Sequence, residues 1–241
     1  AIQIIRTPDR EAVGELLKQE RYIDVIIPRG GKSLIKRIAE ESRIPVIKHY
    51  DGICHQYVAA DADIEMAAAV VVNSKCEKVE VCNALETLLI DAEIAEQALP
   101  ILAQALYAQG VELRGCPRAR AIVEMLPATD EDWVTEYLAP ILSVKVVDGI
   151  DAAIDHINTY GSGHTDGIIT GSLTLADRFT AGVDSASVMV NASTRLSGGG
   201  DYGLGAVVGI STDKLHARGP VGPEELTSYK WVARGAGHLR Q

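Results

Sequence analysis

The sequence predicts an α/β protein with a parallel sheet at its centre. Short apolar segments of strand length alternate along the chain with longer segments whose apolar residues recur at helical spacing. This alternation is typical of βαβ units, in which a helix connects each pair of parallel strands. Loops rich in glycine and serine separate the segments and fit the ends of strands.

The N-terminal part of the chain begins with an apolar segment at residues 2–5, which we expect to form a short buried strand. Thr7 can cap the helix that follows, and Pro8 suits its first position. The other elements predicted for this part are a helix ending near residue 19, strands at 23–27, 45–48 and 53–58, and helices at 32–42 and 61–72. A change in composition near residue 72 predicts a domain boundary there.

From residue 73 onward the same alternation predicts a second α/β unit. Gly110 fits the end of one of its helices. Its predicted strands are 88–90, 111–113, 141–147, 167–170 and 187–191, and its predicted helices are 92–108, 117–123, 150–160 and 173–181. Near the C-terminus, residues 226–233 alternate and are rich in aromatic and β-branched side chains, which predicts a strand that pairs at an edge with another chain.

The composition is that of a globular protein and argues against several functional classes. Of 241 residues 47% are apolar, and the net charge of −10 argues against binding nucleic acid or an anionic membrane surface. No apolar run reaches the length of a membrane-spanning helix, and residues 1–5 show no signal-peptide pattern. The four cysteines form no C-x-x-C pair, so we expect a reducing, cytoplasmic location and no metal site.

Cys82 is the first candidate for catalysis. It precedes a short polar segment, residues 83–87, which leads into the apolar residues 88–90. A thiol at the start of a strand can meet a substrate while the strand fixes its position, and a thiolate is a stronger nucleophile than a hydroxyl near neutral pH. From this residue alone a structural role remains the alternative, because most free cysteines are small buried side chains.

A glycine-rich loop after a predicted strand is the candidate for binding a phosphate group. The loop consists, after Pro28, of Arg29, Gly30, Gly31, Lys32 and Ser33. Its glycines allow a ligand to approach the backbone, and the helix that it opens offers N–H groups with a partial positive charge. The loop matches neither a P-loop nor the G-x-G-x-x-G pattern, so a simple reversal of the chain is an equal alternative.

Three further loops, at residues 160–166, 191–195 and 197–205, are dense in polar residues and glycine. Binding residues concentrate in loops carried on a rigid sheet, although ordinary connections have the same composition. Side chains in these loops that can bind an anion or orient a carbonyl group are His164, Asn191 and Arg195. A cluster at residues 214–220 adds local positive charge, and a solvated basic turn is its alternative reading.

Together these motifs closely resemble one family. The matching segments include IPRGGK at 27–32, VCNALETLL at 81–89 and YGSGHTD at 160–166, with others at 48–55, 135–138, 190–195, 202–205 and 209–220. They resemble the gamma-glutamyl phosphate reductases of the aldehyde dehydrogenase superfamily, and the resemblance extends over essentially the whole chain.

The resemblance implies an aldehyde dehydrogenase-like fold with a partial Rossmann-type cofactor domain and an α/β catalytic domain. Residues 1–72 would form the C-terminal part of the NADP-binding domain, 73–222 the catalytic domain, and 223–241 a C-terminal strand for oligomerisation. The implied reaction is the NADPH-dependent reduction of L-glutamyl 5-phosphate to L-glutamate 5-semialdehyde, with release of phosphate, in proline biosynthesis.

The resemblance also implies roles for individual residues. Cys82 would attack the acyl phosphate to form a thioester, and the N–H group of Cys82 or Asn83 would face the oxyanion. Glu136 would hold the nicotinamide ribose, and residues 29–33 would lie by the phosphates of the cofactor. Candidates for holding the leaving phosphate are Arg195, Lys214, His216 and Arg218, and candidates for holding the glutamyl group are Ser162, His164 and Asn191.

Two departures from the family bear on these expectations. Members of the family carry a further N-terminal part that supplies the first βαβ part of the cofactor domain, so we expect this chain to begin part-way through that domain. Many relatives have an Arg-Pro or Pro-Gly type of loop just before the cysteine, whereas in this chain the loop is Lys78-Val79-Glu80. Glu80 would raise the pKa of the Cys82 thiol, whereas Lys75 or Lys78 would lower it.

Two other functions fit the same residues. One is that of a related acylating enzyme of the superfamily, such as one that uses CoA esters, and the other is that of a fragment without catalytic activity. As partners, the resemblance implies a second copy of the chain and glutamate 5-kinase, either as a separate protein or within a bifunctional kinase–reductase.

Overall fold

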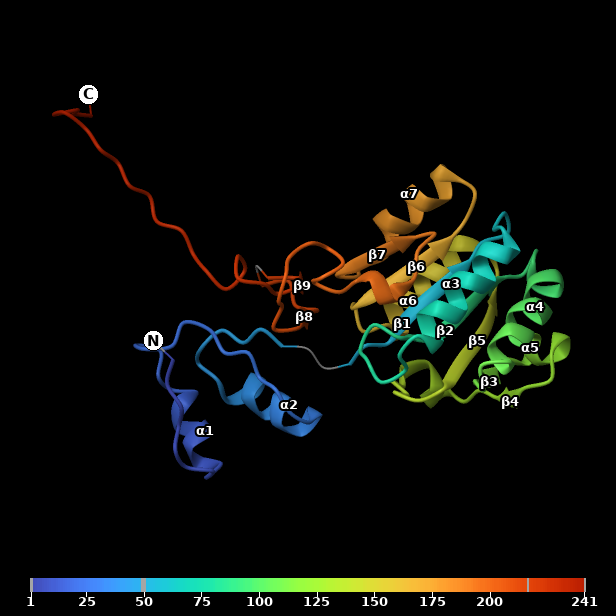
Figure 1. The fold of residues 1–241 in the computed structure, drawn as a ribbon, viewed down its shortest axis with the longest axis horizontal. Helices are drawn as coiled ribbons and strands as arrows, with labels where there is room; N and C mark the ends of the chain where they lie inside the picture. The colour runs from blue at the N-terminus through green and yellow to red at the C-terminus, as the bar shows by residue number, and fades with distance from the viewer. Residues whose placement is uncertain (1, 49–50, 216, 241) are drawn as a thin grey trace.

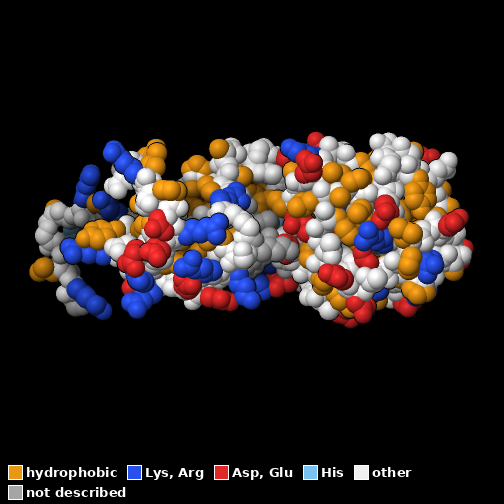
Figure 2. Space-filling model, turned by 90° about the horizontal axis from the view of Figure 1, so that it is seen from below, with side chains coloured by type: hydrophobic (Ala, Val, Ile, Leu, Met, Phe, Trp, Pro, Cys, Tyr) orange, Lys and Arg blue, Asp and Glu red, His pale blue; other side chains and the backbone are white. Residues whose placement is uncertain are grey.

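The computed structural model describes residues 2–48, 51–215 and 217–240, and for Lys32 the backbone alone. Its main body is an α/β unit, while the N-terminal helices and the C-terminal residues lie at the other end of the molecule (Figure 1). Seen from below, Lys and Arg side chains gather at this second end, whereas on the α/β unit they are interspersed with acidic side chains (Figure 2). The charge of the chain is therefore unevenly distributed.

The main sheet has seven strands, and every pair of neighbours in it is parallel. The strands are β1 Cys54–Val58, β2 Leu85–Asp91, β3 Glu112–Gly115, β4 Leu126–Pro127, β5 Ile141–Val147, β6 Thr165–Ile169 and β7 Ser187–Val190. Their spatial order is β4–β3–β5–β2–β1–β6–β7. The predicted parallel sheet is confirmed, and because all its strands begin at one edge, the loops that precede them meet there.

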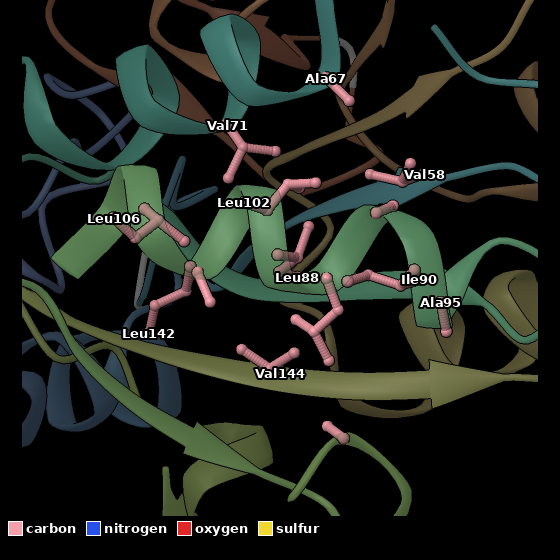
Figure 3. Close-up of a cluster of buried hydrophobic side chains, with 14 of the residues drawn as sticks. Val58, Ala67, Val71, Leu88, Ile90, Ala95, Leu102, Leu106, Leu142 and Val144 are labelled. Atoms are coloured by element: carbon pink, nitrogen blue, oxygen red, sulfur yellow. The ribbon is translucent and has the colours of Figure 1, made fainter. Parts of the chain in front are cut away.

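Helices cover both faces of this sheet and bury its apolar side chains. On one face lie α3 Ile64–Cys76, α4 Ala95–Tyr107 and α5 Pro117–Ile122, and on the other lie α6 Gly149–Tyr160 and α7 Leu173–Gly182. Figure 3 shows the first interface, where Leu88 and Ile90 of β2 pack against Leu102 and Leu106 of α4. All four side chains are fully buried, and each contributes roughly 1.5–3 kcal/mol of hydrophobic stabilisation. Among the described residues, no helix is both long enough and apolar enough to span a bilayer.

Several short elements connect the larger ones and were not expected from the sequence. They are the 3₁₀ helices η1 Asp130–Val134 and η2 Thr194–Leu196 and the antiparallel pair β8 Ile210–Ser211 and β9 Gly219–Pro220. One-turn helices and two-residue strands leave no periodicity in a sequence. In η1 the Asp132 carboxylate accepts the backbone N–H of Thr129 at 2.7 Å, so the start of the segment that leads to β5 is anchored.

The N-terminal region departs from the prediction. Residues 2–5 form no strand, and Ile2 is 96% exposed. Helix α1, Glu11–Leu16, is shorter than predicted, whereas α2, Lys32–Glu41, is confirmed. The strands predicted at 23–27 and 45–48 meet in a single parallel bridge between Ile26 and Val46. An apolar segment extends into a strand only where a neighbour supplies its hydrogen bonds, and the described residues around 2–5 supply none.

Residues 226–233 also form no strand in the structure. The side chains of Tyr229 and Trp231 are 85% and 92% exposed, with their ring centroids 5.9 Å apart. Without a second strand beside it, the alternating pattern has no partner for its backbone hydrogen bonds. The role of this segment in oligomerisation stays a prediction.

The boundary predicted near residue 72 falls inside α3. Strand β1 precedes that helix and lies at the centre of the sheet, with β2 and β6 as its neighbours. Residues 54–72 therefore pack with the residues that follow them. The change in composition near residue 72 comes from the apolar helix α3, because the composition of a helix varies with its burial. It does not coincide with a break between two folded units.

Candidate active site

The candidate residues converge at the edge of the sheet where the parallel strands begin. Cys82 precedes β2 and Glu136 precedes β5, while Ser162 and His164 precede β6. Because β2 pairs with both β5 and β1, and β1 pairs with β6, these loops are neighbours. The site thus lies at the amino ends of the strands, whereas ligands in open α/β sheets usually bind at the carboxyl ends.

Cys82 is half-buried, and its backbone is packed against Gly52 in the loop before β1. A Cβ atom at Gly52 would lie 1.7 Å from the carbonyl oxygen of Cys82, so only glycine fits there. The buried thiol of Cys54 donates to the same carbonyl oxygen at 3.3 Å. The start of β1 therefore fixes the backbone that carries the Cys82 side chain.

The charges around the Cys82 thiol oppose one another. Burial raises the pKa of the thiol, and the Glu136 carboxylate raises it further. The guanidinium groups of Arg195 and Arg29 lower this pKa. The thiol is thus protonated at rest, and any change that removes Glu136 or strengthens the effect of the two arginines favours the thiolate.

These charges differ from the ones expected from the sequence. The carboxylate that raises the pKa of the thiol most is that of Glu136, which the sequence did not indicate for this effect, whereas Glu80 was the expected one. Lys75 points away into the protein interior, where its Nζ atom lies 2.7 Å from Glu86. The deciding contacts join segments about fifty to a hundred residues apart, which a reading of near neighbours in the sequence does not detect.

Asn83 is buried and holds the loop that contains η2. Its amide nitrogen donates to the carbonyl oxygen of Arg195 and to the hydroxyl of Ser197, both at 3.2 Å. Its side-chain oxygen accepts a hydrogen bond from the Arg195 guanidinium, and its carbonyl oxygen accepts from the Thr194 hydroxyl at 2.7 Å. Arg195 is also paired with Glu77 at 2.7 Å. Asn83 therefore places Arg195 next to the cysteine.

Glu136 and Ser162 hold the loop that lies beneath Cys82. The Glu136 carboxylate accepts the backbone N–H of Gly52 at 2.9 Å, and the Ser162 hydroxyl accepts that of Ile53 at 2.9 Å. His164 is fully buried, with its Nδ1 atom 2.9 Å from the Thr165 hydroxyl. The structure thus brings all three predicted residues to the site, as groups that fix its shape.

Lys214 and Arg218 lie together around one carboxylate that the sequence did not indicate. The Arg218 guanidinium donates to Asp184 Oδ1 at 2.9 Å, and the Lys214 ammonium donates to Oδ2 of the same side chain. The two cations hold the pKa of Asp184 below its usual value, Lys214 being the larger cause. Asp184 precedes β7 and so lies at the same edge of the sheet as Cys82. The predicted residue His216 lies outside the described residues.

Among the described catalytic and substrate-binding candidates, Asn191 is the one that the structure does not bring to this edge. It follows β7, and its side chain accepts from the backbone N–H of Thr170 and donates to the Thr170 carbonyl oxygen, both at 2.9 Å. Thr170 follows β6, so both residues lie at the carboxyl edge. The Asn191 amide closes the end of β6 there.

The predicted phosphate-binding loop lies at the start of α2, with Gly31 at the N-cap. Gly31 is exposed, and a Cβ atom there would meet no atom within 4 Å, so the space beside the first turn of the helix is open. Gly30 and Ser33 flank this position, and the side chain of Lys32 is not described. A hollow here is lined by Arg10, Val13, Gly31, Ser33, Leu34 and Arg37. The Arg29 guanidinium turns away from it and donates to the carbonyl oxygen of Val208.

Two buried charge clusters were not predicted from the sequence. Lys75 and Glu86 form one, and the other joins His55 Nδ1 to Asp166 Oδ1 at 2.8 Å. A lysine in an apolar helix and a glutamate in an apolar strand were the available signals. Among the described residues, no group of three or more His, Cys, Asp or Glu side chains could hold a metal ion.

Comparison with known proteins places these features in a family. A model of the aldehyde dehydrogenase family matches residues 111–205. The structure is similar to gamma-glutamyl phosphate reductase from Thermotoga maritima, with 44% identity, 98% of this chain and 57% of that chain covered, and a TM-score of 0.95. The reductase from Saccharomyces cerevisiae gives 32% identity, 83% and 50% coverage, and a TM-score of 0.51. An acetylating aldehyde dehydrogenase from Geobacillus thermoglucosidasius shares the fold, at 20% identity, 98% and 62% coverage, and a TM-score of 0.71.

The parallel sheet, its two helical layers and these matches define an aldehyde dehydrogenase-like protein, and the chain belongs to the aldehyde dehydrogenase superfamily. Within the superfamily its similarity is to gamma-glutamyl phosphate reductases, which confirms the resemblance found in the motifs. The chain spans 57% and 50% of the lengths of the two reductases compared.

Proposed function

We propose that the protein containing this chain reduces L-glutamyl 5-phosphate to L-glutamate 5-semialdehyde with NADPH, and that Cys82 is its nucleophile. The observation that carries the proposal is the 44% identity, over 98% of this chain, to a gamma-glutamyl phosphate reductase. The position of Cys82 supports it, because the thiol is half-buried at the meeting point of four loops and lies near two arginines.

In the proposed reaction the Cys82 thiolate attacks the acyl carbon of the substrate. The bond between that carbon and the phosphate oxygen breaks, phosphate leaves with the electron pair, and a thioester remains on Cys82. A hydride, which NADPH supplies when bound, reduces the thioester carbon. Collapse of the resulting thiohemiacetal releases the aldehyde and returns the thiolate. The N–H groups of Cys82 and Asn83 are the proposed donors to the oxyanion of both steps.

Arg195 is the proposed partner of the leaving phosphate, and Arg29, from the proposed cofactor loop, adds to the positive charge near the thiol. Both lower the pKa of the Cys82 thiol, so both exert a positive potential at the place where the acyl phosphate must react. The same potential stabilises the attacking thiolate. Lys214 and Arg218, which here share Asp184, are further candidates for holding the leaving phosphate, as is His216. Ser162 and His164 are the proposed candidates for holding the glutamyl group.

The start of α2 fits the phosphate groups of a dinucleotide. The N-terminus of α2 at the exposed Gly31 and the two arginines around the adjoining hollow, Arg10 and Arg37, are a donor set suited to anions. We propose that residues 29–33 bind the cofactor phosphates and that Glu136 holds the nicotinamide ribose. The gathering of basic side chains at this end of the molecule agrees with that assignment (Figure 2).

Replacement of the nucleophile tests the proposal. In the intact protein we expect Cys82→Ala to lower the reduction of L-glutamyl 5-phosphate by more than about a thousandfold, because no hydroxyl or thiol replaces the attacking atom. Cys76→Ala, which removes a half-buried thiol from α3, is the matched control and should retain activity. Retained activity in Cys82→Ala would refute the proposed role of the residue.

Two further measurements separate the alternatives. A screen of acyl phosphates against acyl-CoA esters distinguishes the reductase from a CoA-dependent relative. Titration with NADPH distinguishes an active protein from a non-catalytic one, since only the former requires saturable binding. The proposal also includes a place in proline biosynthesis, a cytoplasmic location, and association with a second copy or with glutamate 5-kinase.

A further inference from the structure

We infer that Glu86 is a positioning residue, which acts through the turn at Leu138 to set the place of the Glu136 carboxylate beside Cys82. Glu86 is the second residue of β2 and points to the face of the sheet that carries α3. The inference concerns the arrangement of the site and deepens the proposed function, on which its consequence for cofactor binding rests.

Glu86 is held from α3 by Lys75. The Lys75 ammonium lies 2.7 Å from Glu86 Oε2, and both side chains are fully inaccessible to solvent. Two charges buried this completely are stable only when paired and hydrogen-bonded, so neither side chain can be displaced by itself. The pair therefore fixes a carboxylate in the interior, three residues after Asn83 and four after Cys82.

The second oxygen of this carboxylate faces a strained turn. Glu86 Oε1 accepts the backbone N–H of Leu138 at 3.4 Å. Leu138 has a φ of 51°, in the left-handed region that non-glycine residues rarely occupy. Such a conformation persists only where surrounding contacts hold it. The buried carboxylate is one such contact, since it accepts the N–H group of the strained residue itself.

The turn carries Glu136, two residues before Leu138. Glu136 accepts the backbone N–H of Gly52, which in turn packs against the backbone of Cys82. Tyr137 lies between Glu136 and Leu138 in the sequence, and its hydroxyl is 2.7 Å from Asp132 and 2.8 Å from Ser143. The Lys75 ammonium lies 5.9 Å from the Tyr137 ring centroid. The Lys75–Glu86 pair thus meets the turn at both Tyr137 and Leu138.

The charges near Glu86 agree with this arrangement. Burial raises the pKa of Glu86 to about 7, while the Lys75 ammonium opposes the shift. The groups that face it are Lys75 from α3, Cys54 from β1 and Glu136 from the turn. The Lys75 ammonium favours the ionised form of Glu86, so the ion pair strengthens this carboxylate as an acceptor for the Leu138 N–H.

The test uses the reactivity of Cys82, which needs neither substrate nor cofactor. The Glu136 carboxylate raises the pKa of the thiol, so moving it away should lower that pKa. In Glu86→Leu of the intact protein we expect the pH midpoint for alkylation of Cys82, followed on the Cys82 peptide by mass spectrometry, to fall by roughly half a unit to one unit. Glu86→Gln keeps an acceptor for the Leu138 N–H and should shift the midpoint less.

Two controls make the result specific. Thr87→Val alters the next residue of β2, whose buried hydroxyl has no hydrogen-bond partner among the described residues, and should leave the midpoint unchanged. In a Glu136→Gln background, Glu86→Leu should produce no further shift, because the charge that it displaces is already absent. An unchanged midpoint in folded Glu86→Leu, or an equal shift in both backgrounds, would overturn the inference.

If Glu86→Leu does not fold, the same comparison is made with Glu86→Asp, whose shorter side chain withdraws the carboxylate from the Leu138 N–H, and an unchanged midpoint there counts against the inference. Enzyme assays then test the consequence for cofactor binding, which rests on the proposed function. The KM for NADPH should rise about tenfold in the Glu86 variant, while the burst of phosphate released without NADPH changes less than about twofold. A normal KM together with a shifted alkylation midpoint would leave the positioning role standing and refute the ribose-binding role of Glu136.

Discussion

The backbone of Cys82 is held by a close contact with Gly52 and by a hydrogen bond from the Cys54 thiol. Gly52 is bound in turn by the Glu136 carboxylate, so one glycine joins the acidic residue and the nucleophile. Loops at the start of three strands therefore depend on one close backbone approach. A change at Gly52 tests that dependence without removing any functional group.

We expect Gly52→Ala to abolish most of the activity. The added Cβ atom would lie 1.7 Å from the Cys82 carbonyl oxygen, so the backbone of the nucleophile must move. A displacement of this order costs about a hundredfold in catalytic rate and about 1–3 kcal/mol in the free energy of unfolding. The measurements are kcat and urea unfolding. Gly200→Ala, where the Cβ atom meets nothing within 4 Å, is the control, and equal losses in both variants would contradict the explanation.

At the scale of single residues, the sequence indicated more of the site through the family resemblance than through local chemistry. Glu136 and Arg195 both act on the Cys82 thiol, yet no feature near Cys82 in the sequence pointed to Glu136. Asn191 illustrates the limit. Its loop resembled the others in composition, but a polar loop can follow a strand or precede one, and Asn191 follows β7.

Helix α6 shows how an element can carry a titratable group into the core. Its residue His156 is buried, with the ring of Tyr160 at 4.6 Å and those of His55 and Trp133 at 5.5 Å. The Lys145 ammonium lies 2.9 Å from His156 Nδ1 and donates to it, which requires a neutral imidazole. Burial first, and then the electrostatic effects of His55 and Lys145, lower the pKa of His156 to about 3.

This packing predicts a loss of stability in acid. A depressed pKa in the folded state means that the stabilisation is complete above the unfolded pKa of about 6.5 and is lost as the pH falls toward 3. In urea unfolding at a series of pH values, His156→Gln should lose less stability than the parent protein between pH 6.5 and 4, by up to about 3 kcal/mol. His238→Gln, in the exposed C-terminal segment, should follow the parent. Parallel curves for His156→Gln and the parent would exclude the assignment.

Whole elements were predictable where the sequence is periodic over several turns or alternates inside a buried sheet. The helices α3, α4, α6 and α7 and the strands β1, β5, β6 and β7 were all expected, with bounds that differ by a few residues. Elements at the ends of the chain were not, because their formation depends on neighbours. Residues 2–5 and 226–233 have the composition of strands, but the described chain gives them no partner.

The molecule as a whole therefore combines a sheet buried on both faces with two terminal regions that expose apolar side chains. Leu88 and Ile90 in β2 are fully buried, whereas Ile2 and Trp231 are 96% and 92% exposed. Burial of apolar surface is the main source of stability, so local opening should cost far less at the ends than in the sheet. The exposed ends are also where another chain could add backbone hydrogen bonds.

Hydrogen exchange followed by mass spectrometry tests this difference. At low protein concentration we expect amide protection to be high in β1, β2 and β5 and at least about a hundredfold lower at residues 226–233, which make no strand hydrogen bonds. If this segment pairs with another copy, as the sequence predicts, its protection should rise with protein concentration while that of β2 stays constant. Protection equal to that of β2 and independent of concentration would show that the segment folds within its own chain, against the structure.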